Sequence, residues 1–189
     1  RGIVDAKEFS QALDQLCRLL PRSVIPVLEG VYVHFSGGRC TLTATDLTTW
    51  LTAEIPGHGD DFAFVLTQAK RIAKACRRFS GEMALELTET SEDRSRPLHL
   101  CLRCGSRAGE LNALFPENYP ERPKLEADHT FTVNAAYLLA RIGHVSYPVR
   151  YPPEDANAQR TCVQFCGSHI LSLDGCRLAW DTDEAVNFP

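Results

Sequence analysis

The alternation of apolar and polar residues changes period several times along the chain, and each change indicates a new element. Apolar side chains recur at helical spacing from Phe9 to Leu20, with Asp5 as a candidate N-cap and Glu8 completing a capping-box pattern. Pro21 is predicted to end this helix. From Glu29 to Leu66 the period is two, in the strand-like runs GVYVHF, CTLTATDL, TWLTAEI and FAFVL. The segments SGG, TDLT and PGHGDD between them have turn chemistry, so an antiparallel meander is predicted.

The same succession of patterns then occurs twice more. A helix with Thr67 as its N-cap is predicted from Thr67 to Phe79, followed by the strand patterns EMALELTE, LHLCLR and RAGELNAL. A third round begins with the strand pattern HTFTV and a helix capped by Asn134. The apolar face of that helix is formed by Leu138, Leu139, Ile142 and Val145. The strand patterns TCVQFC, HILSL and CRLAWDT follow it.

The chain is therefore predicted to contain three similar units of about 60 residues, each a strand, a helix and several antiparallel strands. This is an α+β fold, with one domain at residues 1–120, made of units at about 1–66 and 67–120, and a partial domain of one unit at 121–189. The Pro-rich segment FPENYPERPK is predicted to link the domains. A lone third unit would expose an apolar helix face, so we expect a homo-oligomer in which two chains pair their third units.

The composition is that of a soluble globular protein, with 44% hydrophobic and 23% charged residues. No apolar run approaches the ~20 residues that a membrane helix needs, and the start does not resemble a signal peptide. We therefore expect a cytoplasmic protein without a membrane partner.

The eight cysteines are expected to be reduced, because a disulfide framework belongs to short secreted chains. Cys17 and Cys76 fall on apolar helix faces and Cys40 in a strand pattern, where a thiol acts as a small hydrophobic group.

A zinc site is the alternative for some of these thiols, because Cys101 with Cys104 and Cys162 with Cys166 have nearly the spacing of ligand pairs. Residues three apart on a strand face opposite sides, however, so Cys101 and Cys104 are not expected to share a metal. An enzyme that uses one of these thiols or Cys176 is a further alternative, but no pattern supplies a nucleophile with a base and an orienting group. We predict no metal, no cofactor and no catalysis.

The net charge of -4 conceals a helix face that is entirely basic, formed by Lys70, Arg71, Lys74, Arg77 and Arg78. A solvated face is the simplest interpretation of such a run. Faces that only confer solubility usually mix signs, however, and like charges at helical spacing repel, so an anionic partner is indicated.

Further cations accompany the other two helices: Lys7, Arg18 and Arg22 with the first, and Arg141, His144 and Arg150 with the third. If the helices lie side by side, these residues form one positive strip. Such a strip would hold phosphates without reading bases, and its affinity would fall steeply with salt.

Several motifs resemble one family. RSVIPVLEGVYVHFSGGRCTLTATDLTTWLTAEI resembles the first domain of the bacterial DNA polymerase III β sliding clamp, whose members carry R-x-x-[LI]-P-[IV]-L, a hairpin and a T-x-T-D-L turn in this order. FPENYPERPK is similar to the family's link between its first and second domains, and RTCVQFCGSHILSLDGCRLAW to a second-domain segment. The resemblance runs from about Ile3 to Trp180.

The resemblance implies the DNA-clamp fold, in which domains of two βαβββ units form a ring with helices on the inner, DNA-facing side and antiparallel sheets outside. It implies a non-catalytic processivity factor that contacts duplex DNA without sequence preference, with DNA polymerase III and clamp-loader subunits as partners. Arg22, Lys70, Arg71 and Arg77 match positions where clamps present basic side chains to DNA. Gly175, Cys176, Arg177 and Leu178 match part of the groove that receives short peptides of those partners.

The chain departs from the family pattern in three ways. By the resemblance, it corresponds to the first domain and half of the second of the family's three, so we expect this sequence to lack the part of the groove that the third domain supplies. Leu173 and Cys176 replace the usual Thr and His, and Arg160 stands where a pocket-lining Leu is usual. The hairpin between Phe165 and Asp174 is also shorter. The alternative function is therefore a truncated or degenerate protein-interaction module without DNA-clamping activity.

Overall fold

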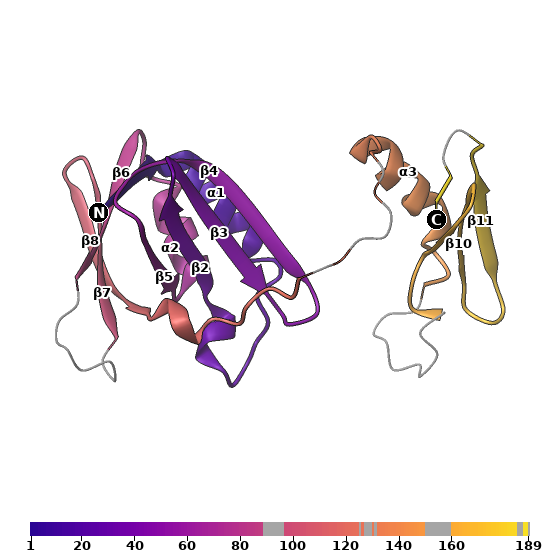
Figure 1. Ribbon diagram of the computed structural model, residues 1–189, viewed down its shortest axis with the longest axis horizontal. Coiled ribbons are helices and arrows are strands. Elements are labelled where there is room, and N and C mark those ends of the chain that lie inside the picture. The colour runs from indigo at the N-terminus through magenta and orange to yellow at the C-terminus, as the bar shows by residue number, and fades with distance from the viewer. Residues whose placement is uncertain are drawn as a thin grey trace. The chain divides into compact units, whose positions relative to one another are not determined.

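The structure is a computed structural model that describes residues 1–88, 97–124, 126, 130, 132–149, 160–184 and 187–188. The chain divides into two compact units, Arg1–Pro123 and Lys124–Pro189 (Figure 1).

The first unit is a closed antiparallel barrel with two helices and two short 3₁₀ turns. Its elements are β1 (Gly2–Asp5), α1 (Ala6–Leu16), η1 (Pro26–Glu29), β2 (Val31–Ser36), β3 (Arg39–Thr45), β4 (Trp50–Gly59), β5 (Phe62–Leu66), α2 (Ala69–Cys76), β6 (Glu82–Thr88), β7 (Leu98–Cys104), β8 (Arg107–Leu114) and η2 (Pro116–Asn118). The strands close in the order β1-β4-β3-β2-β5-β8-β7-β6.

The strand pairings reveal an internal repeat in this unit. β1 pairs with β4 and β6, and β5 pairs in the same way with β8 and β2. The chain β1-α1-β2-β3-β4 is therefore equivalent to β5-α2-β6-β7-β8. The sequence pattern grouped Phe62–Leu66 with the first repeat, whereas its pairings make it the opening strand of the second.

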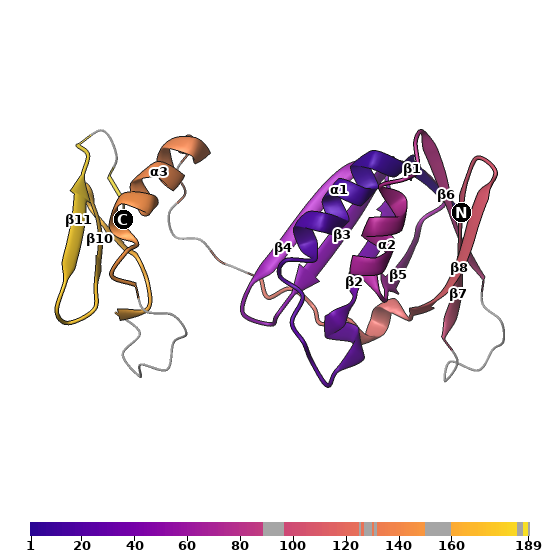
Figure 2. The same ribbon diagram turned by 180° about the vertical axis from the view of Figure 1, so that it is seen from behind.

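The helices α1 and α2 lie side by side across one face of the strands (Figure 2). α1 buries Phe9, Leu13 and Leu16 completely, because these residues share one face at helical spacing. The hydroxyl of Ser10 donates a hydrogen bond of 3.0 Å to the carbonyl oxygen of Ala73 on α2. This buried contact fixes the two helices against each other.

The predicted N-cap of α1 is confirmed, and that of α2 is wrong. Asp5 accepts hydrogen bonds from the backbone N–H groups of Lys7 and Glu8. At α2 the N-cap is Gln68, which has a left-handed backbone with φ of 54°, and the helix begins at Ala69. The Thr67 hydroxyl instead donates to the carbonyl oxygen of Asn112, 2.7 Å away. It joins the end of β5 to β8 and is not available to cap the helix.

The segment PGHGDD, which has the composition of a turn, lies largely within a strand. β4 continues to Gly59, and its last residues pair with β1. At Gly59 φ is 131°, and a Cβ atom would lie 2.1 Å from the carbonyl oxygen of Arg1. Glycine thus lets the two strands approach where any larger residue would collide.

The second unit packs one helix on a small antiparallel sheet. Its described elements are α3 (Ala135–Val145), β9 (Gln164–Cys166), β10 (His169–Leu173) and β11 (Leu178–Thr182), with strand order β11-β10-β9. Asn134 caps α3 by accepting from the backbone N–H of Tyr137, as predicted. The core of this unit is formed by Val145, Ile170, Ala179 and Phe188.

Two expectations for this unit change. Thr132 and Val133, in the strand expected before α3, are not in a strand, and His129 and Phe131 lie outside the described residues. Leu139, expected to pack inward, is 68% exposed. The small sheet covers one side of α3, and Leu139 lies off that side.

Candidate nucleic-acid interface

The basic side chains of α2 are all exposed, as their spacing predicts. The helix buries Ala69, Ala73 and Cys76, and Ile72 packs against the same core, so the other positions from residue 70 to residue 78 face solvent. Those exposed positions carry Lys70, Arg71, Lys74, Arg77 and Arg78, the last two just beyond the last helical residue. We call this set the basic face.

Arg22 joins the basic face from another part of the chain. It is exposed in the segment after α1, and it lines the same surface pocket as Lys70 and Arg71, together with Pro21 and Pro26. The fold thus brings together cations that are nearly fifty residues apart in the sequence.

Arg107 is a cation that the sequence patterns missed. It opens β8, and it lines one surface pocket with Arg71, Lys74 and Arg78. Its guanidinium lies 5.9 Å from the ring centroid of Phe79 and donates a hydrogen bond to the carbonyl oxygen of Arg78. Nothing in the strand pattern of RAGELNAL marks this residue, because its place beside α2 depends on the closure of the barrel.

Arg77 differs from the other members of the basic face because it has a carboxylate partner. Its Nη2 and Nε atoms lie 2.8 and 2.9 Å from Oδ2 of Asp14 on α1. This ion pair joins the two helices and offsets the charge of Arg77. The remaining potential of the face therefore comes mainly from Lys70, Arg71, Lys74 and Arg78.

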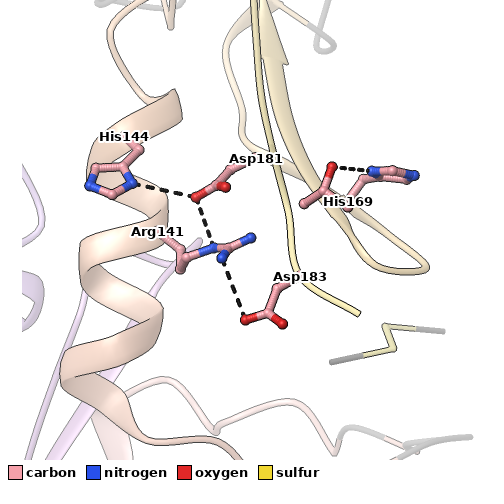
Figure 3. A network of polar contacts seen from close by, with 6 residues as sticks. Arg141, His144, His169, Asp181 and Asp183 are labelled. Carbon is pink, nitrogen blue, oxygen red and sulfur yellow. Dashed lines mark hydrogen bonds and ion pairs between the residues drawn. The ribbon is translucent and has the colours of Figure 1, made fainter. Parts of the chain in front are cut away.

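The structure does not support Arg141 as a free phosphate contact. Its side chain is only 15% exposed, and it points from α3 to two carboxylates of the second unit (Figure 3). Its Nε lies 2.8 Å from Oδ2 of Asp181, and its Nη1 lies 3.4 Å from Oδ2 of Asp183. His144 approaches the same Asp181 oxygen at 3.4 Å. Arg141 therefore joins α3 to β11 through ion pairs, and its assignment as a DNA contact is withdrawn. Arg150, the other cation predicted for this unit, lies outside the described residues.

Asp174 organises the turn in the predicted peptide groove. Its Oδ1 accepts hydrogen bonds from the backbone N–H groups of Cys176 and Arg177. Its Oδ2 accepts two more from Nε and Nη2 of Arg177, at 2.8 and 2.7 Å. These bonds to the carboxylate hold the pKa of Asp174 well below its usual value, with the backbone N–H of Cys176 contributing most.

The turn presents the other groove residues at the surface. Gly175 has φ of 89°, which favours glycine, and the Arg160 guanidinium lies 3.3 Å from where a Cβ would stand at this position. Cys176 is exposed, and Leu178 is 55% exposed at the start of β11. Trp180, two residues farther on the same face, is 66% exposed, and the motif that ends at this residue did not assign it to the groove. Its period-two spacing from Leu178 was the available signal.

The thiols of Cys17, Cys40 and Cys76 are buried, as the patterns predict. Cys104 is buried and Cys101 half-buried on the opposite side of β7, so the two do not converge. Burial raises the pKa of the Cys40 thiol to about 12 and that of Cys76 to about 11. Across the described ranges, no three His, Cys, Asp or Glu side chains gather as a metal site would require.

None of the helices in the described parts of the chain is long and apolar enough to span a bilayer.

Residues 3–123 match a family described as "DNA polymerase III beta subunit, N-terminal domain". The chain is 26% identical over 189 residues to a Beta sliding clamp of Halalkalibacterium halodurans, and this match covers 96% of the chain and 47% of the relative. Among solved structures, the DNA polymerase III subunit beta of Pseudomonas aeruginosa has a TM-score of 0.82 at 17% identity, covering 98% of this chain and 50% of that one.

The DNA polymerase sliding clamp of Bacillus subtilis has a TM-score of 0.80 at 18% identity, covering 99% of this chain and 52% of that one. These likenesses establish the α+β sliding-clamp fold. The chain spans about half the length of the relatives that it matches.

Proposed function

Because this chain belongs to the DNA polymerase III beta subunit family, we propose that it contacts duplex DNA without sequence preference, as a sliding-clamp component in bacterial DNA replication. The observation that carries the proposal is the basic face of α2, beside α1 and joined by Arg22. A protein with a net charge of -4 concentrates exposed cations there. Concentrated cations of this kind suit a polyanion.

The chemistry of the basic face suits phosphate contacts better than base reading. Lys70, Lys74 and Arg78 have long exposed side chains. In the described residues, the carboxylate that pairs with this face is Asp14, and its ion-pair partner is Arg77. Flexible cations of this kind neutralise phosphates wherever they meet them and release counterions. A clamp needs only such weak contacts, since ring closure retains it on DNA.

The proposal extends to the partners of the family. DNA polymerase III and clamp-loader subunits are the proposed protein partners, in the bacterial cytoplasm, and the proposed role of the chain is non-catalytic. The partial peptide groove at Gly175, Cys176, Arg177 and Leu178 is the proposed contact for their short peptides. Exposed Leu178 offers the apolar part of that contact.

We also propose a homo-oligomer that forms through α3. By position after the N-cap, Leu139 on α3 corresponds to Ser10 on α1, which is 2% exposed against α2. In the first unit this face of the helix is therefore a helix-to-helix contact. In the second unit Leu139 is 68% exposed, and a second copy of the chain would cover it.

Reversing the charge of the basic face tests the DNA proposal. A variant with Lys70, Arg71, Lys74 and Arg78 changed to Glu should bind a short duplex about a hundredfold more weakly than the wild type at low salt, because four phosphate contacts become repulsions. The wild type should bind duplexes of unrelated sequence with equal affinity. Fluorescence anisotropy measures both quantities.

The competing function, a protein-interaction module, is favoured by the exposed apolar pair Leu178 and Trp180 on β11. It would prevail if the wild type bound no duplex at low salt yet retained a polymerase or clamp-loader subunit, and lost that subunit on Leu178→Ala.

A further inference from the structure

The β3–β4 hairpin of the first unit and the β10–β11 hairpin of the second have the same kind of turn. Oδ1 of Asp46 accepts hydrogen bonds from the backbone N–H groups of Thr48 and Thr49. Oδ1 of Asp174 accepts from the backbone N–H groups of Cys176 and Arg177, which likewise lie two and three residues after the Asp. The residue after each Asp has a positive φ, 75° at Leu47 and 89° at Gly175. The two hairpins can therefore be compared residue by residue.

In this comparison, Trp50 on β4 corresponds to Leu178 on β11. Each residue opens the strand that follows its turn, four positions after the Asp. Thr45 pairs with Trp50 in the same way that Leu173 pairs with Leu178. The first unit thus carries an aromatic side chain at the position that the second unit uses in its proposed peptide groove.

A pocket of about 580 Å³ lies beside Trp50. One wall is the outer side of β2, β3 and β4, with Tyr32, Thr43 and Trp50. The other wall is the segment after β8, where Glu117, Tyr119 and Glu121 line the pocket.

The second wall is fixed to the first. The Tyr119 hydroxyl donates a hydrogen bond to the carbonyl oxygen of Thr43 at 3.1 Å, and the Tyr119 ring lies 5.4 Å from that of Tyr32. Tyr119 also packs with buried Val27, Leu28 and Val65. The pocket is therefore formed before any ligand arrives, which lowers the entropic cost of binding.

The charge of the pocket selects its ligand. Glu117 and Glu121 contribute two carboxylates against the single guanidinium of Arg122. Burial, with Glu117 as the next cause, raises the pKa of the Tyr32 phenol, as expected for a carboxylate near the ring. Aromatic walls at Tyr32 and Trp50 suit an apolar side chain, and the excess of carboxylates suits a cation beside it.

We propose that this pocket is a second peptide-binding site, and that its ligand is a short extended peptide with an aromatic or aliphatic side chain flanked by lysine or arginine. The inference stands on the geometry of the first unit and does not require DNA binding.

Two fluorescein-labelled hexapeptides with a central Leu-Phe pair test the proposal on the full chain, one flanked by lysines and the other by glutamates. The lysine peptide should bind the wild type about tenfold more tightly than the glutamate peptide. Trp50→Ala should weaken the lysine peptide about tenfold or more, since a central aromatic usually dominates such contacts. A double variant, Glu117→Gln with Glu121→Gln, should bring the two peptides within about twofold of each other.

Matched controls separate the pocket from general attraction to an acidic protein. Glu8→Gln with Glu82→Gln removes the same charge at exposed positions elsewhere and should keep the preference. Leu178→Ala should also leave lysine-peptide binding unchanged. In a Trp180→Phe background Trp50 is the remaining tryptophan of two, and its emission should shift on binding.

The proposal is overturned if the wild type binds both peptides equally or neither at about 1 mM. It is also overturned if the Glu117 and Glu121 variant keeps the tenfold preference, or if Leu178→Ala abolishes binding. Because the Gln substitutions lie at the surface, they remain informative even if Trp50→Ala fails to fold. Duplex binding measured on the same variants should stay at the wild-type level, so failure of this site and failure of the DNA proposal are distinguishable.

Discussion

Asp174 and Asp46 show how a single carboxylate can specify a hairpin. Each accepts two backbone N–H groups that would otherwise lack partners at the turn, and Asp174 also accepts two hydrogen bonds from Arg177. The Asp-Gly and Asp-Leu pairs in the sequence marked both turns. The added bonds to Arg177 were not visible there, because they depend on how the side chain folds back.

The depressed pKa of Asp174 predicts a pH dependence for the second unit. A carboxyl group whose pKa is lower in the folded state stabilises the fold above its unfolded value of about 4, and this contribution falls as pH drops toward the folded pKa. The unfolding midpoint of the wild type should therefore exceed that of Asp174→Asn at pH 7, and the gap should narrow below about pH 4. Trp180 fluorescence in a Trp50→Phe background measures both midpoints. A gap that stays constant down to pH 3 would contradict the assignment.

At the scale of elements, the antiparallel pairing of β1 with β4 depends on Gly59. Gly59→Ala should destabilise the first unit by about 1–3 kcal/mol, because a Cβ would lie 2.1 Å from the Arg1 carbonyl oxygen at a φ that side chains disfavour. Gly109→Ala on β8 is the matched control, since a Cβ there meets nothing within 4 Å. Urea unfolding compares the two. Equal stabilities would show that the strands can part without cost.

The exposed face of α3 predicts self-association. If a second copy covers Leu139, sedimentation equilibrium should give a multiple of 21.0 kDa for the wild type and a lower mass for Leu139→Lys. Lys70→Glu, on a helix of the other unit, serves as a control and should leave the mass unchanged. A wild type that sediments at 21.0 kDa at all concentrations excludes this assembly.

Periodicity predicted most elements because each element buries one side. Its apolar residues therefore recur with a period of 3.6 in a helix or 2 in a strand. It failed where contacts between distant segments decide the outcome. Thr67 bonds to Asn112 and so does not cap α2, and β4 runs through a glycine-rich turn pattern because it meets β1. Leu139 has helical spacing but lies off the side that the sheet covers.

The residues of the candidate site also fall into those that periodicity could predict and those that it could not. The basic face of α2 could be predicted, because helical spacing alone determines which residues share a face. Arg107 could not, since its position beside α2 follows from the path of β8. Arg141 was assigned to DNA by its charge alone, whereas its two carboxylate partners are on β11 and just beyond it, some forty residues away.

At the scale of the whole molecule, charge is distributed by layer in the first unit. The strands carry exposed cations such as Arg39 and Arg103, which pair with Glu54 and Glu86. On the helix layer, α2 presents cations of which Arg77 alone, among the described residues, has a carboxylate partner. This asymmetry is the reason to expect DNA on the helix side.

The most direct test of that expectation is the salt dependence of duplex binding by wild type and by Lys74→Gln with Arg78→Gln. The slope of log K against log salt should become less steep by about 2 in the variant, at about 0.9 for each lost phosphate contact. Arg39→Gln with Arg103→Gln removes the same charge from the strand layer and should leave the slope unchanged. An equal slope in the wild type and the α2 variant, or a loss shared by the strand variant, would contradict the account.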